Sequence, residues 1–234
     1  MVNDLSFGWT GTIGEVTLGA TKTDGGTRSI SYRIGGGSTL PFLEKSPASP
    51  SPLIAYEICD KPVFWSPIVK DYCGDLVNNP GEWAKTATTT YKADLVRLHL
   101  TSTRTRDFSD IASIAKTVET VLSATPLPLI IEGSNEPKID SEVFLKCGEA
   151  GQGERLCLGT AEAGRYRSVA AAALAYNHSI IAQSPIDINL AKQLNILLRE
   201  IGVPRDQIII DPYTGALGYG FEYSYSAMEP IRFS

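Results

Sequence analysis

Two segments of the chain place polar side chains and glycines directly after apolar, strand-like runs, where ligand-binding loops often lie. The first begins at Gln183, continues through "SPIDIN" and leads into an apolar stretch that ends at Leu198. The second is "DPYTGALGYG" (211–220). Their amide, hydroxyl and carboxylate groups can hydrogen-bond a polar ligand. The candidate ligand contacts are Gln183, Ser184, Asp187, Asn189, Asp211, Thr214, Gly215 and Gly218.

The polar residues of the first segment also have structural interpretations. Asp187 stands at the expected start of a helix, so we expect it to cap backbone N–H groups rather than to contact a ligand. For Asn189, capping and ligand contact both stay open. We expect Gln193 to bond a neighbouring element and Asn195 to face solvent. The buried face of this helix is predicted to carry Leu190, Leu194, Leu197 and Leu198.

The second segment allows two interpretations as well. Asp211 ends a strand and Pro212 stops it, while Gly215, Gly218 and Gly220 permit close backbone approach or a positive φ. A tight strand-to-helix connection would use some of these glycines. Three glycines exceed the need of one turn, which favours backbone N–H groups presented to a ligand.

Other chemistry-bearing residues are dispersed. Glu57, Asp60 and Glu132 end different strand-like runs, so a pair of carboxylates for acid/base catalysis remains conceivable at an unknown separation. The four cysteines form no C-x-x-C pair, and His99 and His178 show no metal-ligand spacing. We therefore expect buried, reduced thiols, no metal site and no iron–sulfur cluster. No nucleophilic triad is evident.

The composition excludes several classes of protein. The net charge is -5 and no basic stripe is present, which argues against nucleic-acid binding. The first residues, "MVNDLSFGWT", lack the features of a signal peptide, and no apolar run is long enough to span a membrane. We expect a soluble cytoplasmic protein.

The elements that must position these residues follow a β/α alternation. Residues 1–52 predict a hairpin around "KTDGGTR" and a linker, "EKSPASPSP" (44–52). Residues 53–234 predict six strands, near 53–60, 94–102, 127–135, 155–161, 179–185 and 207–215. Helices are expected at 109–124, capped by Ser109, at 164–176, and at 188–202, closed by Gly202. We expect the hairpin and these units to pack as one domain.

The repeated units imply a parallel sheet, either a barrel or a doubly wound sheet. Nearly every strand candidate ends in polar residues, which favours a barrel whose strand ends open on one mouth. Nucleotide-binding fingerprints are absent. We therefore predict a TIM-type β/α barrel with an N-terminal β-hairpin, truncated after about six of its eight β/α units. Pro230 falls where the last helix should continue. Open strand edges predict marginal stability.

Several blocks resemble one family. "LGATKTDGGTRS" (18–29), "NNPGEWAK" (78–85), "SPIDINLAKQLNILL" (184–198) and "DPYTGALGYGFEYSYSAMEPIR" (211–232) are similar to the small subunit of the corrinoid/iron–sulfur protein, the delta-type subunit of the acetyl-CoA synthase (decarbonylase/synthase) system. The resemblance runs from about Gly11 to Ser234, and the two long blocks are specific.

This resemblance implies a cytoplasmic heterodimer of carbon-fixing, acetyl-CoA-pathway metabolism. A large subunit would hold the corrinoid (cobalamin) and a [4Fe-4S] cluster, and the barrel mouth of this chain would lie against the corrinoid and shield it. A methyltransferase would supply the methyl group from a methyltetrahydropterin, and acetyl-CoA synthase would receive it. The chain itself would be a non-catalytic subunit of the methyl-transfer complex.

The polar mouth leaves an alternative open. A self-standing, pterin-binding β/α-barrel enzyme of the methyltransferase type would also need polar groups at its strand ends.

Overall fold

The computed structural model of the chain describes residues 13–36, 51–61, 65–104, 108–134, 136–218 and 220–233. Most of the expected linker (44–52) lies outside these residues, as do the first residues of the chain.

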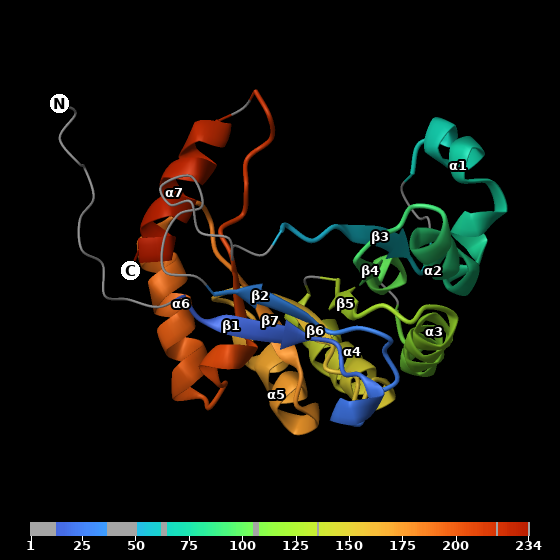
Figure 1. Ribbon diagram of the computed structural model, residues 1–234, viewed down its shortest axis with the longest axis horizontal. Coiled ribbons are helices and arrows are strands. Elements are labelled where there is room, and N and C mark those ends of the chain that lie inside the picture. Colours follow the sequence, from blue (N-terminus) through green and yellow to red (C-terminus); the bar gives the residue numbers. More distant parts are fainter. Residues whose placement is uncertain are drawn as a thin grey trace.

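One parallel sheet forms the centre of the fold (Figure 1). Its six strands follow one another in chain order, and each pairs with the next one in parallel. The strands are β3 (Ala55–Cys59), β4 (Leu95–His99), β5 (Leu129–Glu132), β6 (Cys157–Ala161), β7 (Ser179–Gln183) and β8 (Ile208–Asp211). This sequential order is the order of a β/α barrel, and it confirms the predicted incomplete barrel.

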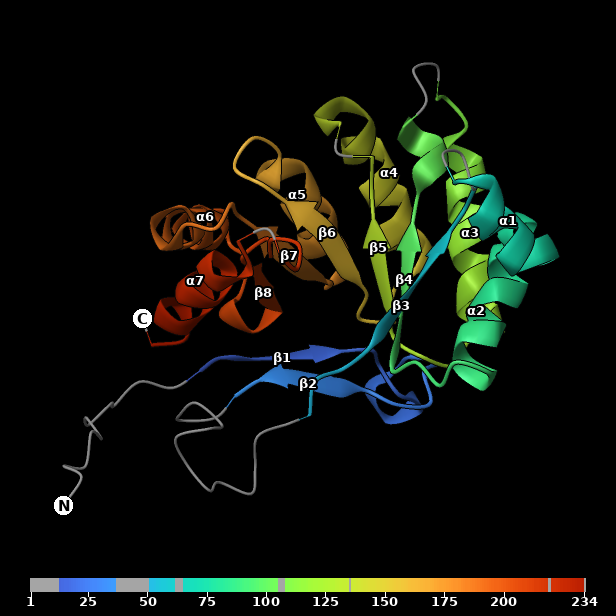
Figure 2. The same cartoon turned by 90° about the horizontal axis from the view of Figure 1, so that it is seen from above.

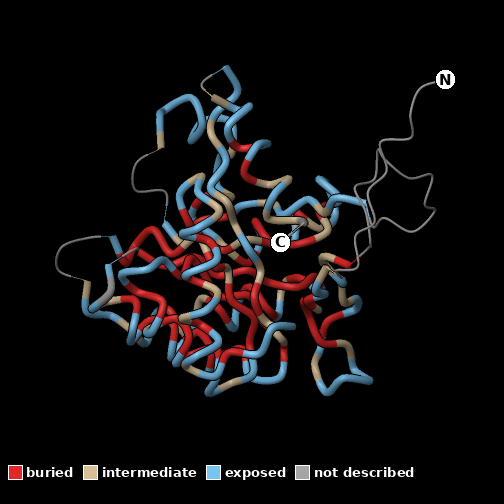
Figure 3. The backbone as a smooth tube through the Cα atoms, turned by 90° about the vertical axis from the view of Figure 1, so that its left-hand side faces the viewer, coloured by how far each residue is buried: buried red, intermediate tan, exposed pale blue. Residues whose placement is uncertain are grey.

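Helices connect the strands and cover the outer face of the sheet (Figure 2). They are α1 (Pro67–Cys73), α2 (Pro80–Thr89), α3 (Ile111–Ala124), α4 (Pro137–Ala150), α5 (Tyr166–Tyr176), α6 (Ile188–Glu200) and α7 (Phe221–Phe233). The main apolar core lies between this layer and the sheet, around Ile58, Leu98, Ile131, Leu158 and Ile180. Buried backbone accordingly gathers in the middle of the molecule (Figure 3).

The ends of the helices correct two expectations. The cap of α3 is Asp110, not Ser109, because the Asp110 side chain accepts a hydrogen bond from the Ser113 N–H. α7 continues through Pro230 instead of stopping there. Proline lies in the last turn, where the missing N–H removes only one helical hydrogen bond. Gly202 follows α6 with a φ of 99°, as a closing glycine should.

The N-terminal hairpin consists of β1 (Glu15–Leu18) and β2 (Tyr32–Gly35). The connection between them is longer than the predicted turn and contains a 3-10 helix, Lys22–Asp24, closed by Gly25. The hairpin lies across the end of the sheet where the strands begin (Figure 2). Val16 and Leu18 pack there against Leu95, Ile130 and Cys157 of the inner face.

Arg28, at the end of this connection, fastens the hairpin to the barrel. Its guanidinium pairs with Glu154 at 2.8 Å and donates to the carbonyls of Leu122, Thr125 and Leu127. It thereby satisfies carbonyls at the carboxyl end of α3, where a cation is favourable. Arg28 therefore has a structural role, at the end of the barrel opposite the mouth.

Candidate functional site at the barrel mouth

Strand alternation gives the inner face of the sheet two zones. Near the strand starts the inner residues are apolar and meet the hairpin. Toward the strand ends they become charged or polar, because Glu57, Arg97 and Glu132 occupy the next inward positions. Gln183 and Asp211 pair at the ends of β7 and β8. The mouth of the open barrel is therefore polar, as its strand-end sequences predict.

Arg97 links the carboxylates of two neighbouring strands. It pairs with Glu57 of β3, its partner in register, at 2.8 Å, and with Glu132 of β5. Arg104 lies 3.8 Å from the second Glu132 oxygen. Glu57 and Glu132 are therefore held in one ion-pair network by a shared guanidinium, instead of facing each other as the conceivable acid/base pair.

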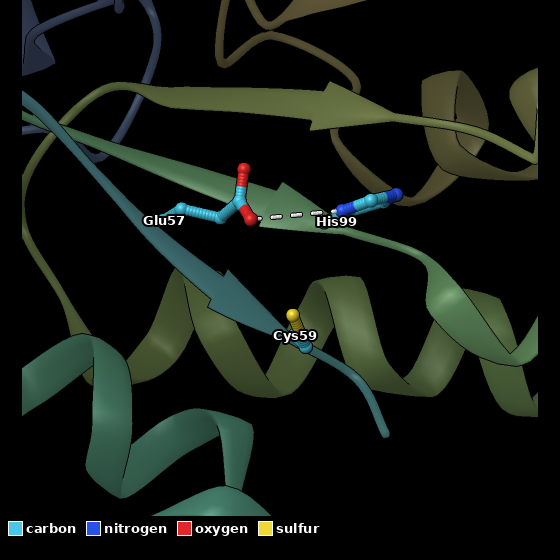
Figure 4. A group of neighbouring side chains, drawn as sticks. All are labelled: Glu57, Cys59 and His99. Atoms are coloured by element: carbon cyan, nitrogen blue, oxygen red, sulfur yellow. Dashed lines mark ion pairs between the residues drawn. The ribbon is translucent and has the colours of Figure 1, made fainter. Parts of the chain in front are cut away.

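His99 lies next to Glu57 on the same inner surface (Figure 4). Its Nδ1 is 3.7 Å from Glu57 Oε1. The pKa of Glu57 is lowered, first by His99 and then by the charge of Arg97, against the opposing effect of burial. Cys59 lies beside both residues, and burial raises the pKa of its thiol to about 12. The free thiol is therefore protonated at neutral pH.

Asp60 is committed to the loop that follows β4. It accepts hydrogen bonds from the Thr101 hydroxyl at 2.9 Å and from the Ser102 N–H at 3.0 Å. Its carboxylate therefore joins the end of β3 to the loop after β4.

A cleft of about 510 Å³ opens on the other side of the mouth. Its walls are the turn 162–164, three leucines along α6 (Leu190, Leu194 and Leu197), and Gln183, Ser184 and Tyr213. Leu190 lines the cleft and is 41% exposed. The prediction that Leu190 lies on the buried face of α6 is therefore wrong. The helix packs through Leu194 and Leu198 instead.

Gln183 and Ser184 are the two predicted residues that line this cleft. The Gln183 amide donates to Asp211 at 2.8 Å, so these two predicted residues lie together. Ser184 is buried, and within the described part of the chain its Oγ has no hydrogen-bond partner. A buried hydroxyl without a partner is uncommon, and a polar ligand group would satisfy it.

The four polar residues along α6 have different roles. Asp187 caps the helix as predicted, because its Oδ1 accepts the N–H groups of Asn189 and Leu190 at 2.7 and 3.2 Å. Asn189 is exposed in the first turn. Gln193 is exposed at the cleft, whereas a bond to a neighbouring element was expected. Asn195 is half-buried and donates to Ala191 of its own helix instead of facing solvent.

The loop after β8 serves mainly its own structure. The Gly215 N–H donates to the buried Ser224 hydroxyl at 2.7 Å. It is therefore used within the loop, contrary to the prediction that it is presented to a ligand. Gly218 has a φ of 77°, which explains its glycine. Thr214 is exposed and lies outside the cleft lining. The loop contributes Tyr213 to the cleft, a residue that the sequence had not singled out.

The charged zone around Arg97, formed with Glu57 and Glu132, was also not predicted from the sequence as one group. The signal was present in "LVRLHL" (95–100), where Arg97 and His99 alternate with buried leucines. Alternate positions of a strand point to the same face, so the two side chains had to share the inner surface. Their partners on β3 and β5 depend on strand register, which the sequence does not display.

Comparison with protein families gives a match over most of the chain. Residues 15–234 match the family described as the CO dehydrogenase/acetyl-CoA synthase delta subunit. The acetyl-CoA decarbonylase/synthase complex subunit delta 1 of Methanosarcina thermophila is 39% identical over 96% of this chain. The delta subunit of Archaeoglobus fulgidus is 40% identical over the same share. The chain covers 52% and 50% of these two relatives, so it spans about half their length.

Solved structures with a similar fold are β/α-barrel enzymes. Dihydropteroate synthase of Xanthomonas albilineans with 4-aminobenzoic acid has a TM-score of 0.52 and 14% identity, covering 77% of this chain and 66% of that one. Dihydropteroate synthase of Anaplasma phagocytophilum with bound 6-hydroxymethylpterin-monophosphate has a TM-score of 0.50 and 17% identity, covering 76% and 73%. At these identities the likeness concerns the fold alone.

Proposed function

Because the chain belongs to the CO dehydrogenase/acetyl-CoA synthase delta-subunit family, we propose that it supports and shields a corrinoid methyl carrier within a multi-subunit acetyl-CoA decarbonylase/synthase complex. The observation that carries this proposal is the family match over residues 15–234. The chain takes part as a non-catalytic subunit in methyl transfer from a methyltetrahydropterin to acetyl-CoA synthase.

The residues of the mouth suit a corrinoid. The macrocycle has an apolar face and a rim of acetamide and propionamide arms, which need both donors and acceptors. The cleft offers leucines of α6 next to the Gln193 amide and the unpartnered hydroxyl of Ser184. Gln183 is held by Asp211, and Asn189 is exposed nearby in sequence. These neutral groups can bind amide arms, and the carboxylate that lines the cleft, Glu162, is paired with Arg165.

When bound, the corrinoid supplies the cobalt that carries the methyl group. The contribution of this chain is to bind and to exclude water. Leu190 and Leu194 offer apolar contact, and Ser184 and Gln193 hold amides in one orientation. A site that excludes water protects a reactive group from side reactions.

Three partner proteins belong to the proposed assembly. A large subunit holds the corrinoid mainly by itself and carries a [4Fe-4S] cluster, while a methyltetrahydropterin methyltransferase and acetyl-CoA synthase associate transiently.

Among the described residues, no helix combines the length and hydrophobicity needed to cross a membrane.

Co-purification of the tagged chain with a corrinoid-bearing large subunit tests this proposal. We expect a stable complex whose corrinoid absorption spectrum changes when this chain is added. If the chain never retains the large subunit, yet binds methyltetrahydrofolate by itself, the proposal is wrong.

A substitution sharpens the test. Asn189→Leu should weaken assembly of the corrinoid complex or alter the cobalt spectrum, because it removes an exposed amide near the cleft. Asn195→Leu is the matched control, since Asn195 lies in the same helix and bonds only its own backbone in the structure. Equal behaviour of both variants and the unchanged chain would remove Asn189 from the site.

One observation favours a second candidate function, a pterin-binding enzyme of the methyltransferase type. The charged zone around Arg97 offers carboxylate acceptors and guanidinium donors side by side, as a fused heterocycle with amide and amine groups requires. Isothermal titration of the chain with methyltetrahydrofolate distinguishes the candidates. Binding abolished by Arg97→Met, without any association with the large subunit, would support the second one.

A further inference from the structure

Three metal-ligand side chains of different chemistry meet on the β3–β4 side of the mouth (Figure 4). A carboxylate oxygen of Glu57, the thiol sulfur of Cys59 and a ring nitrogen of His99 all lie within 4.8 Å of one another. Cys59 is 1% exposed, and the side chain of His99 is 12% exposed. The group is therefore shielded from solvent on one side.

Strand geometry, not sequence spacing, assembles this group. Glu57 and Cys59 are two residues apart on β3, and Cys59 pairs in register with His99 on β4. The register therefore brings His99 opposite Cys59, which lies 40 positions earlier in the chain. This arrangement explains why a search for close cysteine and histidine spacing predicts no metal here.

The donor set selects a class of metal. Thiolate sulfur, imidazole nitrogen and carboxylate oxygen are the ligands of Zn²⁺ and similar borderline divalent ions, whereas Mg²⁺ and Ca²⁺ take oxygen. Ligand bonds of about 2.0–2.3 Å place neighbouring donors about 3–4 Å apart, so the present group needs to contract by about 1 Å. Three protein ligands leave one tetrahedral position for water or substrate.

The surrounding charges can accept such an ion. Binding releases the Cys59 thiol proton to solvent, so Cys59 and Glu57 together balance the two positive charges of the metal. Arg97 already pairs with Glu132 as well as with Glu57, and it holds the second oxygen of the Glu57 carboxylate. A carboxylate held in this way keeps its other oxygen directed toward His99.

We propose that Glu57, Cys59 and His99 form a three-ligand site for a divalent transition-metal ion of the Zn²⁺ type at the barrel mouth. The site is separate from the cleft at α6 and does not depend on the proposed corrinoid function. It gives this side of the mouth a Lewis-acid position with one open coordination place.

Titration of the chelator-treated, full chain with Co²⁺ tests the site, because Co²⁺ replaces Zn²⁺ and reports its ligands optically. We expect one equivalent to bind with a thiolate-to-cobalt charge-transfer band and intense visible bands of a tetrahedral site. Zn²⁺ should displace the cobalt stoichiometrically.

Variants identify the ligands. Cys59→Ser should abolish the charge-transfer band, and His99→Gln or Glu57→Gln should weaken Co²⁺ binding by more than the roughly 10–100-fold lost when a group that only orients a ligand is removed. Cys73→Ser is the control, because Cys73 is a half-buried thiol of α1 outside the group. Far-ultraviolet circular dichroism of each variant verifies folding.

Two outcomes would overturn the proposal. The first is a cobalt spectrum without a thiolate band in the unchanged, folded chain. The second is a band that survives Cys59→Ser or disappears equally in Cys73→Ser. Either result would leave Glu57 and His99 as neighbouring side chains beside a buried thiol.

Discussion

At the scale of single residues, His178 is a buried imidazole whose two nitrogens have opposite roles. Its Nδ1 accepts the Leu156 N–H at 3.2 Å, and its Nε2 lies 3.0 Å from the Gly148 carbonyl, to which only an N–H can donate. This pattern defines the neutral Nε2–H tautomer. Burial lowers the pKa of His178 below its ordinary 6.5, and the Gly148 carbonyl opposes this only in part.

The lowered pKa of His178 predicts acid sensitivity of the fold. At a pH between the lowered pKa of His178 in the folded chain and its ordinary value of 6.5, the unfolded chain binds more protons than the folded chain. The contribution of neutral, buried His178 to the free energy of unfolding is therefore fully present above about pH 6.5 and decreases as the pH falls below it. Urea unfolding at about pH 7.5 and about pH 5.5, above the ordinary carboxyl range, measures this loss. His178→Gln should flatten the difference, and an equal decline in that variant would contradict the assignment.

Single-residue roles were predictable where the cause is local. The cap role of Asp187 followed from its position after Pro185, because capping needs only the chain around it. Glu57, Arg97 and His99 could not be assembled in the same way, since strand register sets their separations. The cleft role of Tyr213 depends on how the loop after β8 folds back, for which the sequence offered no pattern.

At the scale of elements, a buried ion pair helps to hold the hairpin on the barrel. Arg28→Ala leaves the buried Glu154 without its cation and three carbonyls without the guanidinium donor, so it should lower the free energy of unfolding by about 3–5 kcal/mol. Arg33→Ala is the control. The Arg33–Glu15 pair is exposed at 76% and 53%, and its loss should cost at most about 1 kcal/mol. Urea unfolding curves compare the two, and similar losses would deny the anchoring role of Arg28.

Two leucines of helix α6 are expected to contribute differently to the free energy of unfolding. Leu198 is fully buried, and Leu198→Ala should cost about 2–5 kcal/mol of unfolding free energy through the lost burial and the cavity. Leu190 is 41% exposed at the cleft, so Leu190→Ala should cost much less. Denaturant midpoints measure both. A comparable loss at Leu190 would show that this leucine belongs to the core and not to the cleft wall.

The elements themselves followed from the sequence to different degrees. The six strands were predicted because each is an apolar run that ends in polar residues. Helices α3, α5 and α6 were predicted from their apolar periodicity. Helices α1, α2 and α4 were not: α1 is one short helix without a buried residue, and polar side chains interrupt the periodicity of α4. The existence of α2 and α4 depends on packing against neighbouring helices and the sheet.

At the scale of the whole molecule, the sheet has two outer edges. Within the described residues, the outer edges of β3 and β8 pair with no further strand. A closed barrel of this class has eight strands and no edges. Ile54 next to β3 and Ile210 in β8 are 67% and 39% exposed, so apolar surface accompanies the open edges. Unpaired, apolar edges are templates for association with other chains.

The isolated chain should therefore unfold at low temperature and aggregate as it does so. Ile210→Lys should reduce the aggregation with little change in the melting temperature, because a charged side chain on an edge strand opposes pairing. Ile208→Lys is the matched control, since Ile208 is 9% exposed in the same strand and its replacement should unfold the protein. Circular dichroism melts with simultaneous light scattering measure both effects. A sharp, reversible, high-temperature melt of a monomer would contradict this prediction, because it would mean that the hairpin and the helices already compensate for the two open edges.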